Sequence, residues 1–170
     1  HNLYGLNVTP RLHTRLALNE DLVLRASAGK AYRTPNMIAD RVGLLASNRS
    51  WVITASDGSL PYGLQQEEAW NFGFSATQSF EWDFRPASLR VDYYYTDFQN
   101  QIVTDLYATA REVRLYNLAG RSYSHSFQVQ LDYEVVRRLD VRLAYRYLDV
   151  KSTFNGSLEA VPFIGPHRAF

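Results

Sequence analysis

Two stretches of the chain, residues 127–135 and 139–147, alternate strictly between apolar and polar side chains. In the first stretch one parity is entirely apolar: Phe127, Val129, Leu131, Tyr133 and Val135. Because successive side chains of a β-strand point to opposite faces, each stretch predicts a strand with one apolar and one polar face. A soluble sandwich would turn the apolar face towards a core, whereas an outer-membrane barrel would turn it towards lipid.

The same alternation predicts seven strands in all, in residues 11–18, 22–32, 70–80, 88–106, 127–135, 139–153 and 161–170. Their connections alternate in length. Those near Asn19, Asp83 and Val136 are short, and those at 33–66, 107–113 and around Asn155 are longer. Short turns at one end and longer loops at the other are typical of an up-and-down outer-membrane barrel. We therefore predict an all-β fold, an antiparallel up-and-down transmembrane β-barrel segment of about seven strands.

The composition excludes several classes of protein. The formal net charge is +1, from 18 basic and 17 acidic residues, which gives no support to a nucleic-acid binder. The chain has no cysteine, so a disulfide scaffold and thiolate metal sites are excluded. No apolar run reaches the roughly 18–20 residues of a membrane helix. The 12 tyrosines, 9 phenylalanines and 3 tryptophans suit a membrane interface, although their strand propensity alone would also explain them.

A set of motifs in a fixed order resembles the TonB-dependent receptors of Gram-negative outer membranes. LRASAGKAYRTPN resembles a strand that ascends to the outer surface, with Gly29, Tyr32, Arg33 and Pro35. The motifs that follow resemble the next strands in turn: LQQEEAWNFGFSATQSF, VDYYYTDFQNQIV, YNLAGRSYSHSFQVQLDYEV, RLAYRYLDVKST and VPFIGPHRAF. One departure is that Ser126-Phe127-Gln128 stands where the family commonly has Gly-x-Glu. AWNFG and YNLAGRSYSHSF are most similar to Bacteroidetes members.

The resemblance implies that residues 1–170 form part of a barrel of about 22 strands, with the plug domain and last strands absent. It also implies that an N-terminal plug region engages the TonB-ExbB-ExbD complex. The protein would then be no enzyme and would need no cofactor. It would import a siderophore, haem, cobalamin or glycan across the bacterial outer membrane, and a surface lipoprotein is a candidate partner. A passive porin or adhesin-type barrel and a soluble carbohydrate-binding β-sandwich remain as alternatives.

Three groups of residues follow as candidates within this interpretation. The first would contact ligand from the long connection, although Trp51 and Tyr62 could instead pack the loop on itself: Asn48, Arg49, Trp51, Asp57 and Tyr62. The second would face the lumen and contact the plug or an anionic ligand: Arg11, Arg15, Arg25, Arg90, Arg142 and Arg146. The third would anchor the barrel at the lipid interface: Tyr93, Tyr95, Tyr133, Tyr145 and Tyr147.

Catalytic and metal sites are not expected. His125 and Asp132 lie on opposite parities of one predicted strand, so they cannot form the mutual hydrogen bonds of a triad. The four histidines, at positions 1, 13, 125 and 167, lack the spacing of a metal-binding motif.

Overall fold

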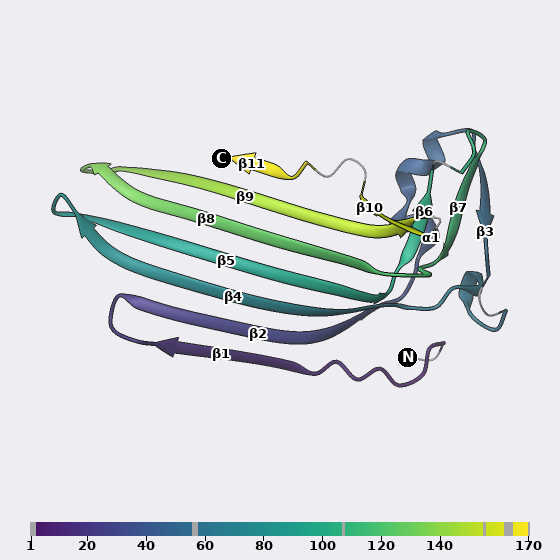
Figure 1. Ribbon diagram of the computed structural model, residues 1–170, viewed down its shortest axis with the longest axis horizontal. Coiled ribbons are helices and arrows are strands. Elements are labelled where there is room, and N and C mark those ends of the chain that lie inside the picture. The colour runs from purple at the N-terminus through teal and green to yellow at the C-terminus, as the bar shows by residue number, and fades with distance from the viewer. Residues whose placement is uncertain (1–2, 56–57, 107, 155, 162–164, 170) are drawn as a thin grey trace.

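The computed structural model describes residues 3–55, 58–106, 108–154, 156–161 and 165–169. Its main feature is an open antiparallel sheet of long strands in up-and-down order (Figure 1). The six longest of its eight described strands are β1 (Arg11–Ala17), β2 (Leu22–Arg33), β4 (Glu67–Trp82), β5 (Arg85–Asn100), β8 (Ser122–Val136) and β9 (Leu139–Phe154). The short strands β10 (Ser157–Ala160) and β11 (His167–Ala169) both pair with β9. The predicted all-β fold is confirmed.

The turns at one end of the sheet are tight. β4 and β5 are joined by Asp83 and Phe84 alone, with φ of 51° and 57°. Two consecutive positive φ angles are typical of a type I′ turn, whose twist matches that of the flanking strands. The sequence predicted a longer turn here, through Ala87, but Pro86 already lies within β5. The β8–β9 turn is equally short, and Arg138 has φ of 72°.

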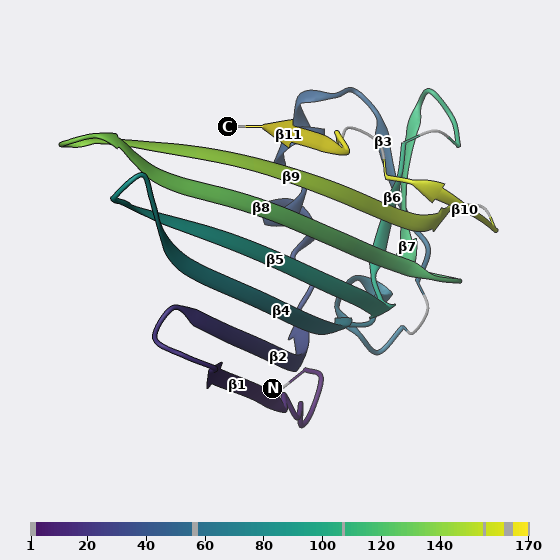
Figure 2. The same cartoon turned by 60° about the vertical axis from the view of Figure 1, so that its left-hand side comes forward.

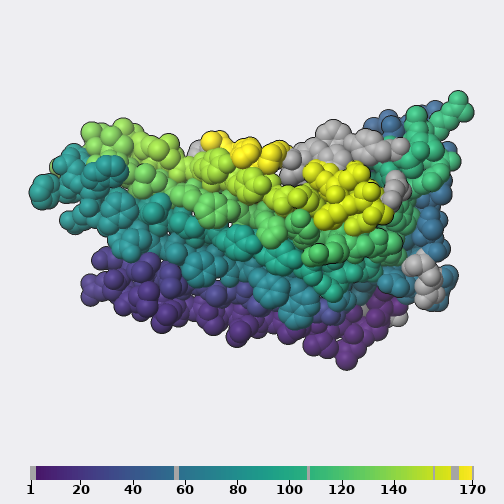
Figure 3. All heavy atoms as spheres, viewed as in Figure 1, coloured from purple at the N-terminus to yellow at the C-terminus, as the bar shows by residue number. Residues whose placement is uncertain are grey.

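The connections at the opposite end form a second, three-stranded sheet (Figures 1 and 2). It contains β3 (Ser50–Ile53), β7 (Glu112–Asn117) and β6 (Ile102–Asp105), in that order. The long connection also contains α1 (Met37–Asp40) and the 3-10 helices η1 (Val42–Ala46) and η2 (Pro61–Gly63). In the space-filling view these segments gather at one end of an elongated molecule (Figure 3).

Two of the predicted strand boundaries were wrong. Residues 88–106 were expected to be one strand, but β5 ends at Asn100 and Ile102–Asp105 joins the second sheet. Residues 161–170 were expected to begin a strand at Val161; in the described part of that range, Val161 is outside any strand and β11 covers His167–Ala169. At the first of these boundaries the alternation of side chains continues past the point where the chain changes its pairing partner, from β4 and β8 to β7.

The apolar face of the main sheet is continuous across strands. The register aligns Phe74 with Tyr93 and then Tyr93 with Phe127. One level nearer the turns, it aligns Val91 with Val129. Large apolar side chains on this face are exposed, and Leu143 is 61% exposed. A β-sandwich would bury this face against a second sheet, so the exposed apolar face favours a barrel wall that faces lipid.

The hydrophobic core lies in the loop region rather than along the main sheet. Five buried residues form it: Met37, Leu64, Ile102, Val113 and Leu115. Trp51 and Ile53 of β3 pack against this cluster. The loops therefore have a small core of their own.

Candidate functional site

The loop-end sheet joins two segments that are far apart in sequence. β3 pairs with β7 in parallel, with Ser50 opposite Glu112 and Ile53 opposite Leu115. β6 pairs with β7 in antiparallel fashion, with Ile102 opposite Asn117. Because each of these strands spans only four to six residues, the packing of Leu115 and Val113 at 0% exposure must carry much of the stability. We call this loop-end sheet, with α1, η1 and η2, the loop module.

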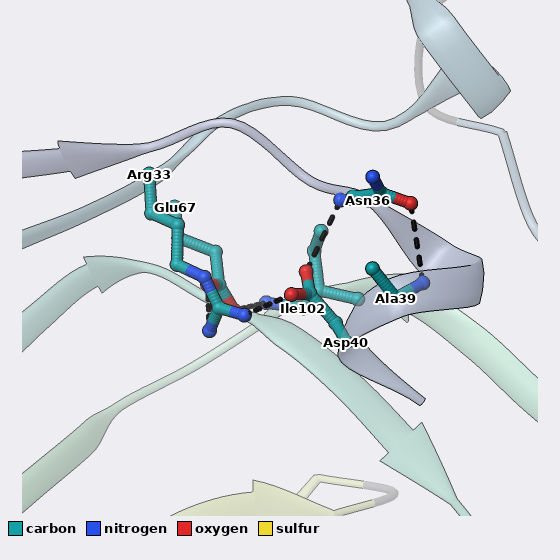
Figure 4. Close-up of polar contacts among 6 residues, drawn as sticks. All are labelled: Arg33, Asn36, Ala39, Asp40, Glu67 and Ile102. Carbon is teal, nitrogen blue, oxygen red and sulfur yellow. Dashed lines mark hydrogen bonds and ion pairs between the residues drawn. The ribbon is translucent and has the colours of Figure 1, made fainter. Parts of the chain in front are cut away.

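An ion-pair network joins the loop module to the main sheet (Figure 4). Arg33, the last residue of β2, forms ion pairs with Asp40 of α1 and, at 3.3 Å, with Glu67, the first residue of β4. Glu67 also accepts the backbone N–H of Ile102 at 3.1 Å. One carboxylate therefore connects the start of β4, the end of β2 and the start of β6.

Asn36 and Asp40 stabilise the short helix that follows Arg33. The Asn36 side chain caps α1 by accepting the Ala39 N–H at 3.2 Å, and the Asn36 N–H donates to the Asp40 carboxylate at 3.1 Å. This backbone donor, and then the Arg33 guanidinium, lower the pKa of Asp40 below its usual value. A lowered pKa means that Asp40 stabilises the fold above the ordinary carboxyl pKa. That contribution is lost as the pH falls through the lowered value.

A cluster of side-chain amides forms a second connection. Asn117 accepts the Gln65 N–H at 3.0 Å and donates to the Asn100 side-chain oxygen at 3.2 Å. Asn100 in turn donates to the Gln66 backbone carbonyl at 2.9 Å. The cluster therefore binds the end of the long connection to the strand ends on both sides of it. In the sequence, Asn100 and Asn117 were noticed only as parts of family motifs, with no role assigned.

Replacing Glu67 by alanine should loosen β6 and β7 while leaving the main sheet intact. The substitution removes the acceptor of the Ile102 N–H, and an unsatisfied buried donor costs about 1–3 kcal/mol. We expect faster amide hydrogen exchange in residues 102–106 and 112–117, measured on the intact receptor in detergent. Glu68→Ala is the matched control, because Glu68 pairs with Lys30 at 2.6 Å instead of with the loop module. Equal exchange in the two variants would contradict the assigned role.

The five residues predicted to contact ligand have different environments. Arg49 donates to the Leu106 backbone carbonyl at 3.0 Å, so it joins the two loop segments. Trp51 is half-buried against the loop core. Asn48 is exposed, and Tyr62 is 45% exposed with a left-handed φ of 58°. Asp57 lies outside the described residues. Thus Asn48 and Tyr62 present their side chains to solvent, whereas Arg49 and Trp51 are largely engaged within the loop module.

The polar face of the main sheet carries the six arginines. Arg142 forms an ion pair with Asp132 at 2.6 Å, and Arg146 donates to Ser126 at 3.2 Å. Arg15 and Arg25 are direct cross-strand partners, an arrangement of like charges that destabilises a sheet. Within the described part of the chain, neither of them forms an ion pair. Arg11 lies on the same face, opposite Gly29.

A groove of about 590 Å³ on this face is lined by three of the six arginines. Arg15, Arg25 and Arg90 line it together with His13 and Asp92. A second groove, of about 810 Å³, lies nearer the tight turns and is mainly acidic, with Asp21, Glu81, Asp132, Glu134 and Asp140 beside Arg142. On the polar face, positive charge therefore gathers in the groove lined by β1, β2 and β5, and negative charge gathers in the groove nearer the tight turns.

Aromatic side chains lie at both ends of the apolar face. Near the turns, Tyr133 packs against Trp82 with ring centroids 5.6 Å apart. Nearer the loops, Tyr95 and Tyr123 contact His125. Tyr93 and Tyr147 are both aligned with Phe127, and Tyr145 is aligned with Val129, so these three tyrosines lie at mid-strand levels, where Tyr93 contacts His125 and Tyr145 and Tyr147 contact His167. Tyr123 and Tyr133 are ten positions apart on β8, which is about 34 Å along the strand. A strand tilt of about 40° reduces this to about 26 Å, close to the apolar band of an outer-membrane barrel.

The described residues give no sign of a metal centre or a helical membrane span. In that part of the chain, no group of three or more His, Asp or Glu side chains is arranged to hold a metal ion. No helix formed by those residues is long and apolar enough to cross a membrane.

The comparison with known families identifies the family to which this β-sheet belongs. The model of the family described as TonB dependent receptor-like, beta-barrel matches residues 2–170. No curated protein and no solved structure matches the chain. The family comprises receptors and transporters of the bacterial outer membrane and is not a family of enzymes. With its up-and-down strands, exposed apolar face and polar opposite face, the chain belongs to the TonB-dependent receptor-like β-barrel family.

Proposed function

We propose that this chain is one part of a receptor barrel that binds a scarce nutrient outside the cell and imports it with energy supplied through TonB. The observation that carries the proposal is the loop module, which has its own core and stands at one end of a wall with opposite apolar and polar faces. Ordered outer loops provide a rigid surface for a ligand, and the polar face provides an aqueous or plugged interior.

The main sheet is open, which supports a larger barrel. In the described residues, β1 pairs on one side only, with β2. An unpaired edge within lipid would leave backbone groups without hydrogen bonds, so further strands must close the wall. We infer that residues 1–170 supply about seven strands of a barrel of about 22, and that a plug domain outside this chain fills its lumen.

The basic groove supports contact with such a plug. Arg15 and Arg25 oppose each other directly, and their mutual repulsion would be relieved by a carboxylate from inside the lumen. Arg11, Arg90, Arg142 and Arg146 lie on the same polar face. We propose that this face holds the plug, while the plug region engages the TonB-ExbB-ExbD complex.

For the ligand, we propose the outer surface of the loop module. Asn48 and Tyr62 are the candidates with exposed side chains, and Arg49 and Trp51 support the loops beneath them. Asp57 remains a candidate from the sequence alone. The ligand would be a siderophore, haem, cobalamin or glycan, and a surface lipoprotein could deliver it. A Bacteroidetes origin, suggested by the sequence motifs, is part of the same proposal.

The test is uptake by the intact receptor in cells with and without TonB. We expect one labelled compound of the four classes to accumulate only when both the receptor and TonB are present. Dissipating the proton-motive force should abolish the accumulation. Uptake that persists without TonB would instead indicate a passive porin. An intact receptor that is monomeric in water without detergent would indicate a soluble β-sandwich.

A further inference from the structure

A pocket of about 590 Å³ lies on the apolar face of the main sheet, at the level where the strands approach the loops. Its described lining is mostly aromatic, with Phe72, Tyr93, Tyr95, Tyr123 and His125 beside Arg121 and Leu158. Most of these residues share the strand parity that faces lipid. The pocket is thus on the outside of the barrel and is separate from the lumen and from the proposed ligand surface.

His125 is held in place by the surrounding rings. Its Nδ1 is 2.8 Å from the Tyr93 hydroxyl, and its ring lies 4.8 Å from Tyr95 and 5.1 Å, edge-on, from Tyr123. This packing fixes the orientation of the imidazole. The Nε2 atom makes no hydrogen bond to the described residues, so it is available to a group that approaches from the lipid side.

Arg121 is a cation without a counter-ion in the described part of the chain. Its backbone N–H and carbonyl both bond to Thr153, whereas its guanidinium makes no ion pair there. The carboxylates nearby are already engaged: Asp149 with Lys151 at 3.7 Å, and Asp97 with Tyr95 at 3.5 Å. A guanidinium offers a planar pair of donors that suits a phosphate group.

The surface on the membrane side of the pocket is apolar. Phe74, Val91 and Phe127 continue the lipid-facing parity from Phe72, Tyr93 and His125 towards the turns. A molecule with an anionic head and an acyl tail matches both the cation and the apolar surface, because its head would contact Arg121 while its tail lies along these side chains. A small soluble anion would contact Arg121 but not the apolar surface.

We propose that this pocket binds the phosphate-bearing headgroup of an outer-leaflet lipid, with Arg121 as the main contact and His125 as the second donor. The inference rests on the membrane orientation in the proposed function. It concerns the outer wall alone, so it requires neither an imported ligand nor TonB.

The experiment measures binding of lipid A by native mass spectrometry of the intact receptor released from detergent. Lipid A with both phosphates is compared with the dephosphorylated form. We expect Arg121→Gln to weaken binding of the phosphorylated form by about tenfold, the usual effect of losing a charge-assisted hydrogen bond. Binding of the dephosphorylated form should not change. His125→Phe, which keeps a ring in the aromatic cluster, should weaken phosphate-dependent binding less.

Arg137→Gln is the control for loss of one positive charge, because Arg137 is exposed at the β8–β9 turn, at the opposite end of the strands. It should leave both affinities unchanged. Equal binding of the two lipid forms, or an unchanged affinity in Arg121→Gln, would overturn the proposal. Displacement of the lipid by an equal concentration of inorganic phosphate would also overturn it, because the acyl part would then contribute nothing. Failure of uptake with intact lipid binding would count against the proposed function only.

Discussion

Replacing Val129 by arginine should lower the free energy of unfolding of the receptor in a bilayer by about 2–4 kcal/mol. Val129 lies near the middle of β8 on the lipid-facing parity, aligned with Val91 on one side and Tyr145 on the other. An arginine there would have to place its charge in the hydrocarbon region or distort the bilayer to reach water. The measurement is denaturant-induced unfolding of the intact receptor reconstituted in lipid vesicles.

Gln128→Arg is the matched control, because Gln128 is adjacent to Val129 on β8 but occupies the polar face. There it is aligned with Asp92 on one side and with Arg146 on the other, so an added positive charge meets one carboxylate and one guanidinium. We expect a change within about 0.5 kcal/mol, as for other substitutions in aqueous surroundings. If Gln128→Arg were the more destabilising of the two, the assignment of the faces would be reversed and the lipid-facing interpretation would be wrong.

Replacing Leu115 by alanine should unfold the loop module without opening the barrel. Leu115 has 0% exposure in the loop core, and removing a buried leucine side chain costs about 2–5 kcal/mol. Because the module contains only five core residues, that loss is large relative to its total stability. We expect limited proteolysis to cut residues 101–121, while the receptor keeps the heat-sensitive electrophoretic mobility of a folded barrel. Ligand binding should be lost as well.

Leu45→Ala is the control variant, because it makes the same leucine-to-alanine change at a position in η1 that is 58% exposed instead of buried. It should leave proteolysis and binding unchanged. Equal protease resistance of the two variants would mean that the loop core does not hold the module together. Ligand binding that survives in a proteolysed Leu115→Ala receptor would instead move the proposed site away from the loop module.

Most of the main sheet could be predicted from the sequence because the relevant information is local. Alternation along residues 127–135 and 139–147 identifies two strands and their faces, and the same pattern assigns Leu12 and Phe74 to the apolar face. Lipid contact imposes this pattern on every strand independently of its neighbours. The short turns could be located for the same reason, although alternation alone did not reveal the two-residue turn at Asp83 and Phe84.

Less of the candidate site could be predicted from the sequence. The long connection was recognised as unusual, and packing of Trp51 within it was one alternative, yet its composition did not indicate that Trp51 would pack against a core that includes residues of β6 and β7. The roles of Glu67 and Asn117 also depend on partners more than 30 residues away, Ile102 and Gln65. Such contacts follow from how the chain folds back on itself, which no local pattern encodes.

By itself the sequence determined the long strands of the main sheet, the apolar and the polar face of each, and the resemblance to the family. Those properties follow from the solvent that each side chain must face, which is decided residue by residue. Only the tertiary structure decided that residues 102–105 leave the wall to join β7, that Arg33 and Glu67 connect the wall to the loops, and that Arg121 borders an aromatic pocket on the outer side. These features arise from packing and hydrogen bonding between distant segments, where many side chains must be satisfied together.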